Sequence, residues 1–364
     1  MNPIAFAVPV FFALILLELW VAHSRGVQVY RLKDSLTSIN VGIMSEFSKA
    51  IGGVISLVMY TLITDRFGAF TWDISHPMTW ISALVLYDFC YYWVHRTGHE
   101  INILWASHVV HHSSEEFNLS TALRQSSTGF LFRWIFYIPL ALLGYPVKVF
   151  VVVGLIDFVY QYWVHTQLIG KLGWLEYVVV TPSNHRVHHG QNDYCIDKNY
   201  GGIFSVWDRM FATYADERDD EKPVYGIRKP IESWNPLWAN LHQFVQIWQQ
   251  VKSAESWRHR LMYVFAKPSW TPEKEDATEV FESKYFSRFD TPASAGLIRF
   301  SFMGTLLGAA LLMVYFYVQS RLPQPLRISY CVLMVWVIAG IGWRMTQTRQ
   351  VDTTQAVKGQ GHAE

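Results

Sequence analysis

The sequence predicts an all-α integral membrane protein, built as a multi-pass helical bundle with a histidine-rich cap. Two observations support this prediction. Among the 364 residues, 51% are hydrophobic and 16% are aromatic, and the apolar residues lie in long blocks that give a mean hydropathy of +0.14. In addition, nine of the 14 histidines lie at or soon after the ends of such blocks.

The apolar blocks approach the length of membrane helices, which need about 20 residues each. The first block could instead be a signal peptide, but it lacks a basic start and a small-residue cleavage site, so we expect an uncleaved anchor. The short block at 130–143 turns at the sequence GYP into the next one, and the last two blocks form a hairpin. The predicted spans are residues 4–21, 39–63, 78–94, 130–143, 147–164, 293–318 and 328–343.

Lysine and arginine in the short loops predict the orientation of these spans. The loop after the first block carries three cations, whereas the loop after the second carries only Arg66. Because cytoplasmic loops are enriched in such residues, the first loop is expected on the cytoplasmic side. Alternation then places all the dense histidine clusters on that side, while Arg321 and Arg327 fall in a loop on the other side, against the rule.

Charge and cysteine content indicate which partners and sites are not expected. The 30 Lys and Arg residues balance the 29 Asp and Glu residues, so no overall field favours a nucleic acid, and no such partner is expected. The three cysteines, Cys90, Cys195 and Cys331, are far apart and form no CxxC pair. Neither a disulfide framework nor a thiolate metal site is expected, and the chemistry is expected in a reducing compartment.

The clustered histidines predict a metal centre. His95 and His99 are four residues apart, so on a helix they lie on one side and can bind one ion. Nine imidazoles are too many for one ion, but two ions with four or five ligands each would use them all. Nitrogen ligands without thiolate suit iron better than structural zinc, which remains the alternative. The candidate ligands are His95, His99, His108, His111, His112, His165, His185, His188 and His189.

The histidine segments echo each other. DFCYYWVH at 88–95 is repeated as DFVYQYWVH at 157–165, and HVVHH at 108–112 as HRVHH at 185–189. Two related half-sites follow, although the halves can interleave, so the partition of ligands between the ions stays open.

Asp88 and Asp157 either orient histidine ring nitrogens or join helices. Glu115 and Glu116 either bind a reductant, orient ligands or form a solvated face. The loop at 194–202 is expected to line the mouth of the pocket.

Two segments, HRTGHEINILWASHVVHHSSEEFNLSTALRQS and TPSNHRVHHGQNDYCIDKNYGGIFSVWDRMFATY, resemble the fatty acid hydroxylase and sterol desaturase superfamily, and within it the alkylglycerol monooxygenases. The resemblance covers roughly residues 34–227. It implies a membrane-embedded non-haem di-iron oxygenase with a cytoplasmic di-iron cap, the nine histidines as ligands and tetrahydrobiopterin as a reductant. Acyl hydroxylases of this superfamily carry one further histidine where Ile169 stands here, so water or Asn118 is expected to complete the ligand set. Glu100 is a candidate for catalysis and reductant binding.

The predicted function is therefore a monooxygenase that hydroxylates a membrane lipid with molecular oxygen. The favoured reaction cleaves an O-alkyl glycerol ether to a fatty aldehyde. The alternatives are a hydroxylase or desaturase of a sterol, a fatty acyl group or an ornithine-type lipid, and a non-catalytic metal-binding or transport protein. The electron donor stays open. The active site is expected on the cytoplasmic side of the bacterial inner membrane or of the endoplasmic reticulum.

Four parts of the chain are predicted. They are N-terminal membrane helices at 1–77, the catalytic di-iron hydroxylase core at 78–227, a cytoplasmic linker or cap at 228–292, and a C-terminal membrane hairpin and tail at 293–364.

Overall fold

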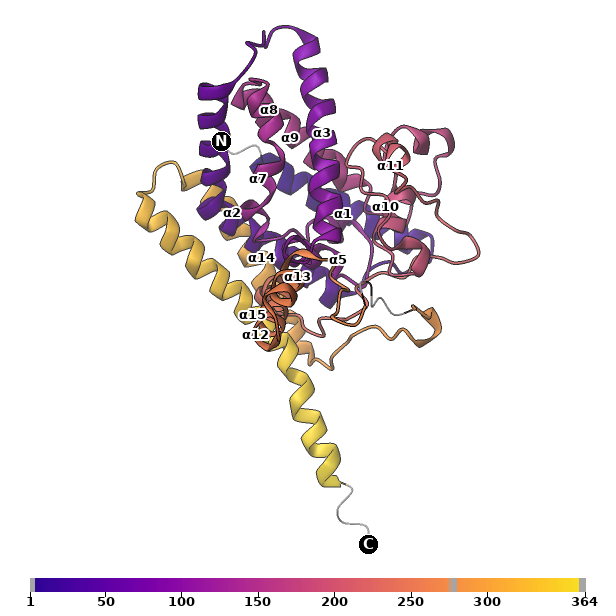
Figure 1. Ribbon diagram of the computed structural model, residues 1–364. Coiled ribbons are helices and arrows are strands. Elements are labelled where there is room, and N and C mark those ends of the chain that lie inside the picture. The colour runs from indigo at the N-terminus through magenta and orange to yellow at the C-terminus, as the bar shows by residue number, and fades with distance from the viewer. Residues whose placement is uncertain (1–3, 275, 277–279, 360–364) are drawn as a thin grey trace.

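The computed structural model describes residues 4–274, 276 and 280–359 (Figure 1). Within these residues all named elements are helices, and extended backbone pairs only at three isolated bridges. The all-α prediction is confirmed. The longer helices are α1 (Ile4–Ser24), α2 (Leu32–Phe67), α3 (Pro77–Glu100), α9 (Val147–Trp163), α12 (Pro236–Ser253), α13 (Trp257–Phe265), α14 (Ala295–Val318) and α15 (Gln324–Gly359).

Short helices connect these elements, and several of them carry the histidines. They are α4 (Asn102–Ala106), α5 (Val109–His112), α6 (Leu119–Ala122), α7 (Arg133–Phe136), α8 (Ile138–Leu142), α10 (Pro182–His188) and α11 (Val206–Met210), with 3-10 turns η1 (Gly129–Leu131), η2 (Gly173–Tyr177), η3 (Asp193–Cys195) and η4 (Ser283–Tyr285).

Three helices are long and apolar enough to cross a membrane. They comprise Ala5–Ser24 in α1, the whole of α14, and Gln324–Gln347 in α15. Helix α2 adds a fourth if its two parts, which meet at an angle of 50°, form one span. The membrane-protein prediction is thereby confirmed, and two apolar helices stand where the C-terminal hairpin is predicted.

The predicted span at 130–143 is wrong as a single helix. The chain there forms η1, α7 and α8 in succession, because Pro139 has no N–H to continue a helix from α7, and Gly144 then adopts a φ of +83° in the following turn. Helices α3 and α9 form as predicted but are not among the three apolar spans. Helix α9 has only 17 residues, and α3 carries Asp88 and a charged C-terminal end.

Helices α3 and α9 are held together by an apolar core that also includes α2 and α8. Figure 1 shows α8 and α9 between α2 and α3. Tyr60 stacks on Phe150 with ring centroids 4.1 Å apart, and Tyr87 stacks on Tyr137 at 4.5 Å. A Cβ atom on Gly154 would lie 2.9 Å from the Tyr87 hydroxyl, so glycine permits this close approach. As a result, the C-terminal ends of α3 and α9 meet at the same place.

The C-terminal hairpin packs on α2 rather than standing apart. Phe47 of α2, Leu312 of α14 and Ile338 of α15 belong to one buried cluster, which Trp234 closes from the segment before α12. Helix α1 is also tied to the centre of the molecule, because the Glu18 carboxylate accepts hydrogen bonds from the Tyr30 and Thr166 hydroxyls and from the Leu119 N–H. The four-part division of the chain stays a prediction.

Candidate metal centre

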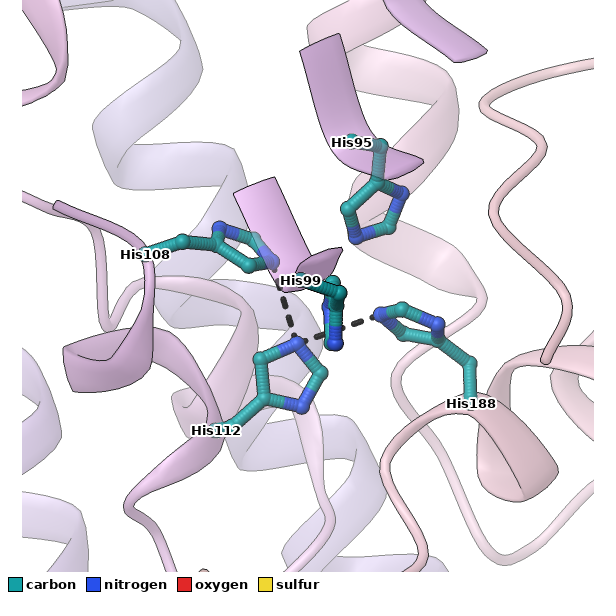
Figure 2. A group of neighbouring side chains, drawn as sticks. All are labelled: His95, His99, His108, His112 and His188. Atoms are coloured by element: carbon teal, nitrogen blue, oxygen red, sulfur yellow. Dashed lines mark hydrogen bonds between the residues drawn. The ribbon is translucent and has the colours of Figure 1, made fainter. Parts of the chain in front are cut away.

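The nine predicted histidines gather into two groups at the C-terminal ends of α3 and α9. Within each group, the nitrogen atoms that can bind a metal all lie within 4.8 Å of one another. We call them the five-histidine group, which Figure 2 shows converging on one point, and the four-histidine group. The first contains His95, His99, His108, His112 and His188, and the second contains His111, His165, His185 and His189.

The two halves of the sequence interleave in these groups. The five-histidine group takes His188 from the second half, and the four-histidine group takes His111 from the first. Adjacent residues on a helix point about 100° apart, so neighbouring histidines such as His111 and His112 face different groups. Both repeated segments therefore contribute histidines to the centre, but each group takes ligands from both halves of the sequence.

Local signals begin the helices that carry the histidines. Helix α10, which carries most of HRVHH, is capped by Thr181. The Thr181 backbone N–H donates to Asn184 Oδ1 at 3.0 Å, and Pro182 is in the first turn. Helix α3 starts at His76, whose Nδ1 accepts from the Met78 N–H at 3.2 Å, and Pro77 follows it. These caps fix where each helix begins, and so fix which way its histidines point.

Backbone carbonyls orient four of the imidazole rings. His95 Nδ1 lies 2.8 Å from the Tyr200 oxygen, and His188 Nδ1 lies 2.9 Å from the Lys198 oxygen. In the other group, His111 Nδ1 lies 3.0 Å from the Arg124 oxygen and His165 Nδ1 lies 2.7 Å from the Gln161 oxygen. A carbonyl only accepts, so Nδ1 carries the proton in each ring, and the Nε2 lone pair is directed into the group.

Burial keeps these rings neutral. It lowers the pKa of His165 to about 3 and that of His188 to about 4. The pKa values of the other seven are also lowered by burial and, in each case, by neighbouring histidines. At neutral pH the nine imidazoles are therefore uncharged and can act as metal ligands.

The neutral nitrogens fit a metal ion better than they fit one another. His165 Nε2 lies 3.0 Å from His185 Nε2 and 3.3 Å from His111 Nε2, although the Nε2 atoms of His165 and His111 both carry lone pairs. The buried Nε2 atoms of His95 and His99 have no hydrogen-bond partner among the described residues. Such buried, unpaired acceptors are costly, and a cation at the centre of each group would satisfy them.

Aromatic residues and two cavities surround the groups. The fully buried Phe117 ring lies 5.5 Å from the His165 ring and stacks on Tyr225. A cavity of about 290 Å³ borders His99, His112, His188 and His189 on one wall and residues 226–276 on the other. A second cavity of about 20 Å³ lies between α3 and α7 and reaches His95 and His108. The five-histidine group therefore borders both cavities, whereas the four-histidine group borders only the larger one, through His189.

The comparisons with known proteins agree with this geometry. Residues 80–213, which contain all nine histidines, match the family model for fatty acid hydroxylase. Alkylglycerol monooxygenase from Homo sapiens is 44% identical over 269 residues, which are 74% of this chain and 60% of the human protein. The Danio rerio enzyme is 44% identical over 271 residues, with the same two shares. The part of the chain that holds the histidines is thus similar to the fatty acid hydroxylase family.

The chain is also similar to proteins of lower identity. Ornithine lipid hydroxylase OlsE from Rhizobium tropici is 31% identical over 146 residues, which are 39% of this chain and 44% of that protein. The chain spans about 60% of the length of the two alkylglycerol monooxygenases. No solved structure matches it. The resemblance inferred from the histidine motifs is confirmed.

Two further residues predicted for the site lie outside both histidine groups. Glu100 is at the end of α3, where its partly exposed carboxylate pairs with Arg96 at 3.0 Å. Asn118 caps α6: its Oδ1 accepts from the Ser120 N–H at 3.0 Å, and its Nδ2 donates to the Val29 oxygen at 2.7 Å. The geometry gives Asn118 a folding role and offers no support for it as a ligand.

Asp88 and Asp157 do not contact histidine rings. Asp88 accepts from the backbone N–H groups of Ile203 and Phe204, at 2.6 and 3.0 Å, and Asp157 accepts from Gln161 at 2.6 Å. Any influence on the ligands therefore passes through the backbone. The close packing is visible at Gly202, where an added Cβ would lie 2.7 Å from Asp88 Oδ1 and 2.8 Å from Asp157 Oδ1.

Of the alternatives for Glu115 and Glu116, the solvated face is wrong. Their exposures are 7% and 2%, and both pair with Arg31, at 3.1 and 2.5 Å. Arg288 adds a contact of 3.4 Å to Glu116. These carboxylates join the loop before α2 and the segment before α14 to the histidine-bearing segment.

The loop at 194–202 was predicted to line the pocket mouth, and it does so through Cys195, Ile196 and Asp197 at the larger cavity. Sequence reasoning missed the carbonyl acceptors of Lys198 and Tyr200, because a backbone oxygen leaves no mark in the sequence.

Proposed function

We propose that this protein is a membrane-bound non-haem di-iron monooxygenase that cleaves O-alkyl glycerol ethers. The observation that carries the proposal is the pair of converging imidazole groups, in a chain that is 44% identical to two alkylglycerol monooxygenases. Nitrogen donors without thiolate and with room for several ligands suit iron. Bound iron would supply the reduction of oxygen and the removal of hydrogen from an unactivated carbon.

The residues of the chain hold and shield this centre. Backbone carbonyls set the ring orientations, burial keeps the imidazoles neutral, and Phe117 with Tyr225 keeps water from the four-histidine group. In the reaction, the ether methylene beside the oxygen gains one oxygen atom from O₂, and two electrons with two protons reduce the other atom to water. The hemiacetal then breaks its bond to the glycerol oxygen, which gives a fatty aldehyde and a free glycerol hydroxyl.

We propose that the alkyl chain approaches from the side of the smaller cavity, which has to widen to admit it, because about 20 Å³ holds a single water. Val94, Leu104, Phe132 and Phe136 line it beside His95 and His108. Next to it, Leu131 and Ile135 are both 48% exposed, as expected for side chains that face lipid. An ether lipid that keeps its glycerol at the interface would present its first methylene close to the ligand groups.

The larger cavity is the proposed site for the reductant, tetrahydrobiopterin. Its wall combines Trp105 and Trp270 with the amides of Gln243 and Gln246, which suits a flat molecule with many hydrogen-bonding groups. Turnover in purified membranes is expected to require tetrahydrobiopterin. Activity that follows ferredoxin or cytochrome b5 and ignores the pterin would assign the chain to another branch of the hydroxylases.

The charge of the loops supports a cytoplasmic active site, in the inner membrane of a bacterium or the endoplasmic reticulum of a eukaryote. A transport protein is disfavoured, because transport sites place ionisable groups near mid-membrane, whereas these histidines lie in the last turns of α3 or beyond the ends of α3 and α9.

The test is to supply cells or membranes containing the protein with a 1-O-alkylglycerol and to measure the matching fatty aldehyde. We expect the aldehyde to form only with oxygen and to vanish in the His111→Ala protein. The second candidate, hydroxylation of an acyl, sterol or ornithine lipid, is favoured by the similarity to the ornithine lipid hydroxylase. A hydroxylated lipid without aldehyde would select that candidate and exclude ether cleavage.

A further inference from the structure

The segment 198–204, which we call the ligand strap, holds two members of the five-histidine group. Its Lys198 carbonyl accepts from His188, and its Tyr200 carbonyl accepts from His95. Two buried carboxylates hold the strap itself. Asp208 accepts from the N–H groups of Tyr200 and Gly201, at 2.7 and 2.8 Å, whereas Asp88 holds the far end at residues 203 and 204.

One peptide unit of the strap lies between a carboxylate and a candidate ligand. The peptide that joins Tyr200 to Gly201 donates its N–H to Asp208 Oδ2, and its carbonyl accepts from His95 Nδ1. A negative charge at the N–H end of a peptide increases the electron density on its oxygen, because the two bonds polarise the same group in the same direction. The carbonyl is then a stronger acceptor for the imidazole.

The surroundings of Asp208 favour its ionised form at neutral pH. All three of its neighbours donate, since the Thr213 hydroxyl adds a bond of 2.7 Å to those of Tyr200 and Gly201. Thr213 in turn contacts the Tyr92 hydroxyl at 3.0 Å, which accepts from Arg96 at 3.1 Å. Burial raises the pKa of Asp208, and the hydrogen bonds and the Arg96 charge act against that rise.

The peptides whose carbonyls accept from His188 and His111 have no carboxylate at their N–H end in the described part of the chain. The N–H of Asn199, in the peptide that holds His188, donates to the neutral Thr213 carbonyl at 2.9 Å. The N–H of Gln125, in the peptide that holds His111, donates to the neutral Leu123 carbonyl at 2.9 Å. His95 is thus distinguished from His188 and His111 by a charge one peptide away.

We propose that Asp208 is a positioning residue for His95 and acts through the peptide that joins Tyr200 to Gly201. It fixes the proton on Nδ1, sets the ring orientation and makes Nε2 a better donor to the ion of the five-histidine group. The inference rests on the proposed metal centre. It is the carboxylate–histidine–metal arrangement of metalloenzymes with one peptide unit inserted.

The test measures iron binding and not activity. Wild-type protein and Asp208→Asn protein are depleted of metal, titrated anaerobically with ⁵⁷Fe(II), and examined by Mössbauer spectroscopy. The His188→Ala protein identifies the signal of the five-histidine group. We expect Asp208→Asn to weaken iron binding at that group by up to about 10-fold and to change its signal, less than the loss of a ligand's direct hydrogen-bond partner, because the Tyr200 carbonyl still accepts from His95. The other signal should stay unchanged.

The matched control is Asp88→Asn, which loosens the same strap but leaves the Asp208 bond in place. Equal weakening by both variants would mean that only the fold of the strap matters, and would overturn the inference. If Asp208→Asn does not fold, Thr213→Val removes one donor from Asp208 and should change the same signal less. Wild-type protein that does not bind two irons refutes the metal centre itself. Two irons with unchanged affinity and signal in the Asp208 or Thr213 variant refute the inference alone.

Discussion

The two histidine groups are built from similar motifs but lie in different surroundings. The five-histidine group contributes three of the five histidines that border the larger cavity, and the strap holds two of its members. The four-histidine group packs against Phe117, and its members His111 and His165 are held by the carbonyls of residues 124 and 161. Two similar motifs have therefore produced one group that borders a cavity and one that is more enclosed. Such a pair suits a centre in which one of two ions contacts the reactants.

The largest expected effect comes from removing one ligand of each group. His188→Ala and His111→Ala should each lower iron content and reduce activity more than about 100-fold, since even partners of ligands are worth about 10- to 100-fold. Both variants should remain in the membrane, because the apolar helices are unchanged. His23→Ala, at an exposed site outside both groups, is the control. Full activity with either ligand missing would contradict the assignment of that group.

The metal-free protein should lose stability as the pH falls. The folded-state pKa values of His165 and His188 are about 3 and 4, below the ordinary value of 6.5. Between pH 6.5 and about 4 the unfolded chain therefore binds more protons than the folded chain, so the free energy of unfolding decreases as the pH is lowered. This stability is complete above pH 6.5. The slope is about 1.4 kcal/mol per pH unit for each such histidine.

Thermal unfolding of metal-free protein at pH 7 and pH 5 checks this. We expect a lower Tm at pH 5. An equal or higher Tm at pH 5 would show that the histidines of the two groups are not held neutral by the fold.

A methyl group at Gly202 should disturb the five-histidine group through the strap. The added Cβ would meet Asp88, Asp157 and the Tyr91 ring, all within 2.8 Å, so Gly202→Ala should destabilise the protein by about 1–3 kcal/mol, the usual cost of overpacking. The control is Gly170→Ala, where nothing lies within 4 Å of the new atom. A greater loss of iron signal from the five-histidine group than from the four-histidine group would confirm that the effect passes through the strap. Equal loss from both would contradict it.

The smallest effect is expected at Glu100. Its carboxylate is about a third exposed and pairs with Arg96, and such pairs contribute about 0–1 kcal/mol. Glu100→Gln should therefore leave the Tm almost unchanged. If Glu100 binds the reductant, as predicted, the KM for tetrahydrobiopterin should rise while iron content stays the same. An unchanged KM would remove the residue from the site.

The sequence was sufficient where chemistry depends on side chains at short spacing. The nine histidines and the helical ends that carry them were predicted, because HxxxH and HxxHH patterns place imidazoles on a few turns of helix. The apolar hairpin at the C-terminus was predicted for a similar reason, since its length and composition are local properties.

The remaining features depend on contacts between distant segments. The interleaving of His111 and His188 follows from how α5 meets α10, and the acceptors on residues 198 and 200 are backbone atoms of a loop. Glu115 and Glu116 looked like a solvated face because their partners, Arg31 and Arg288, lie far away in the sequence. The helix predicted at 130–143 is broken for a local reason, because Pro139 interrupts the apolar block.

The most direct test of the two-group centre is the metal content of the purified, active protein. Elemental analysis alongside a protein assay should give two irons per chain. One metal per chain, or zinc alone in protein that is fully active, would contradict the account.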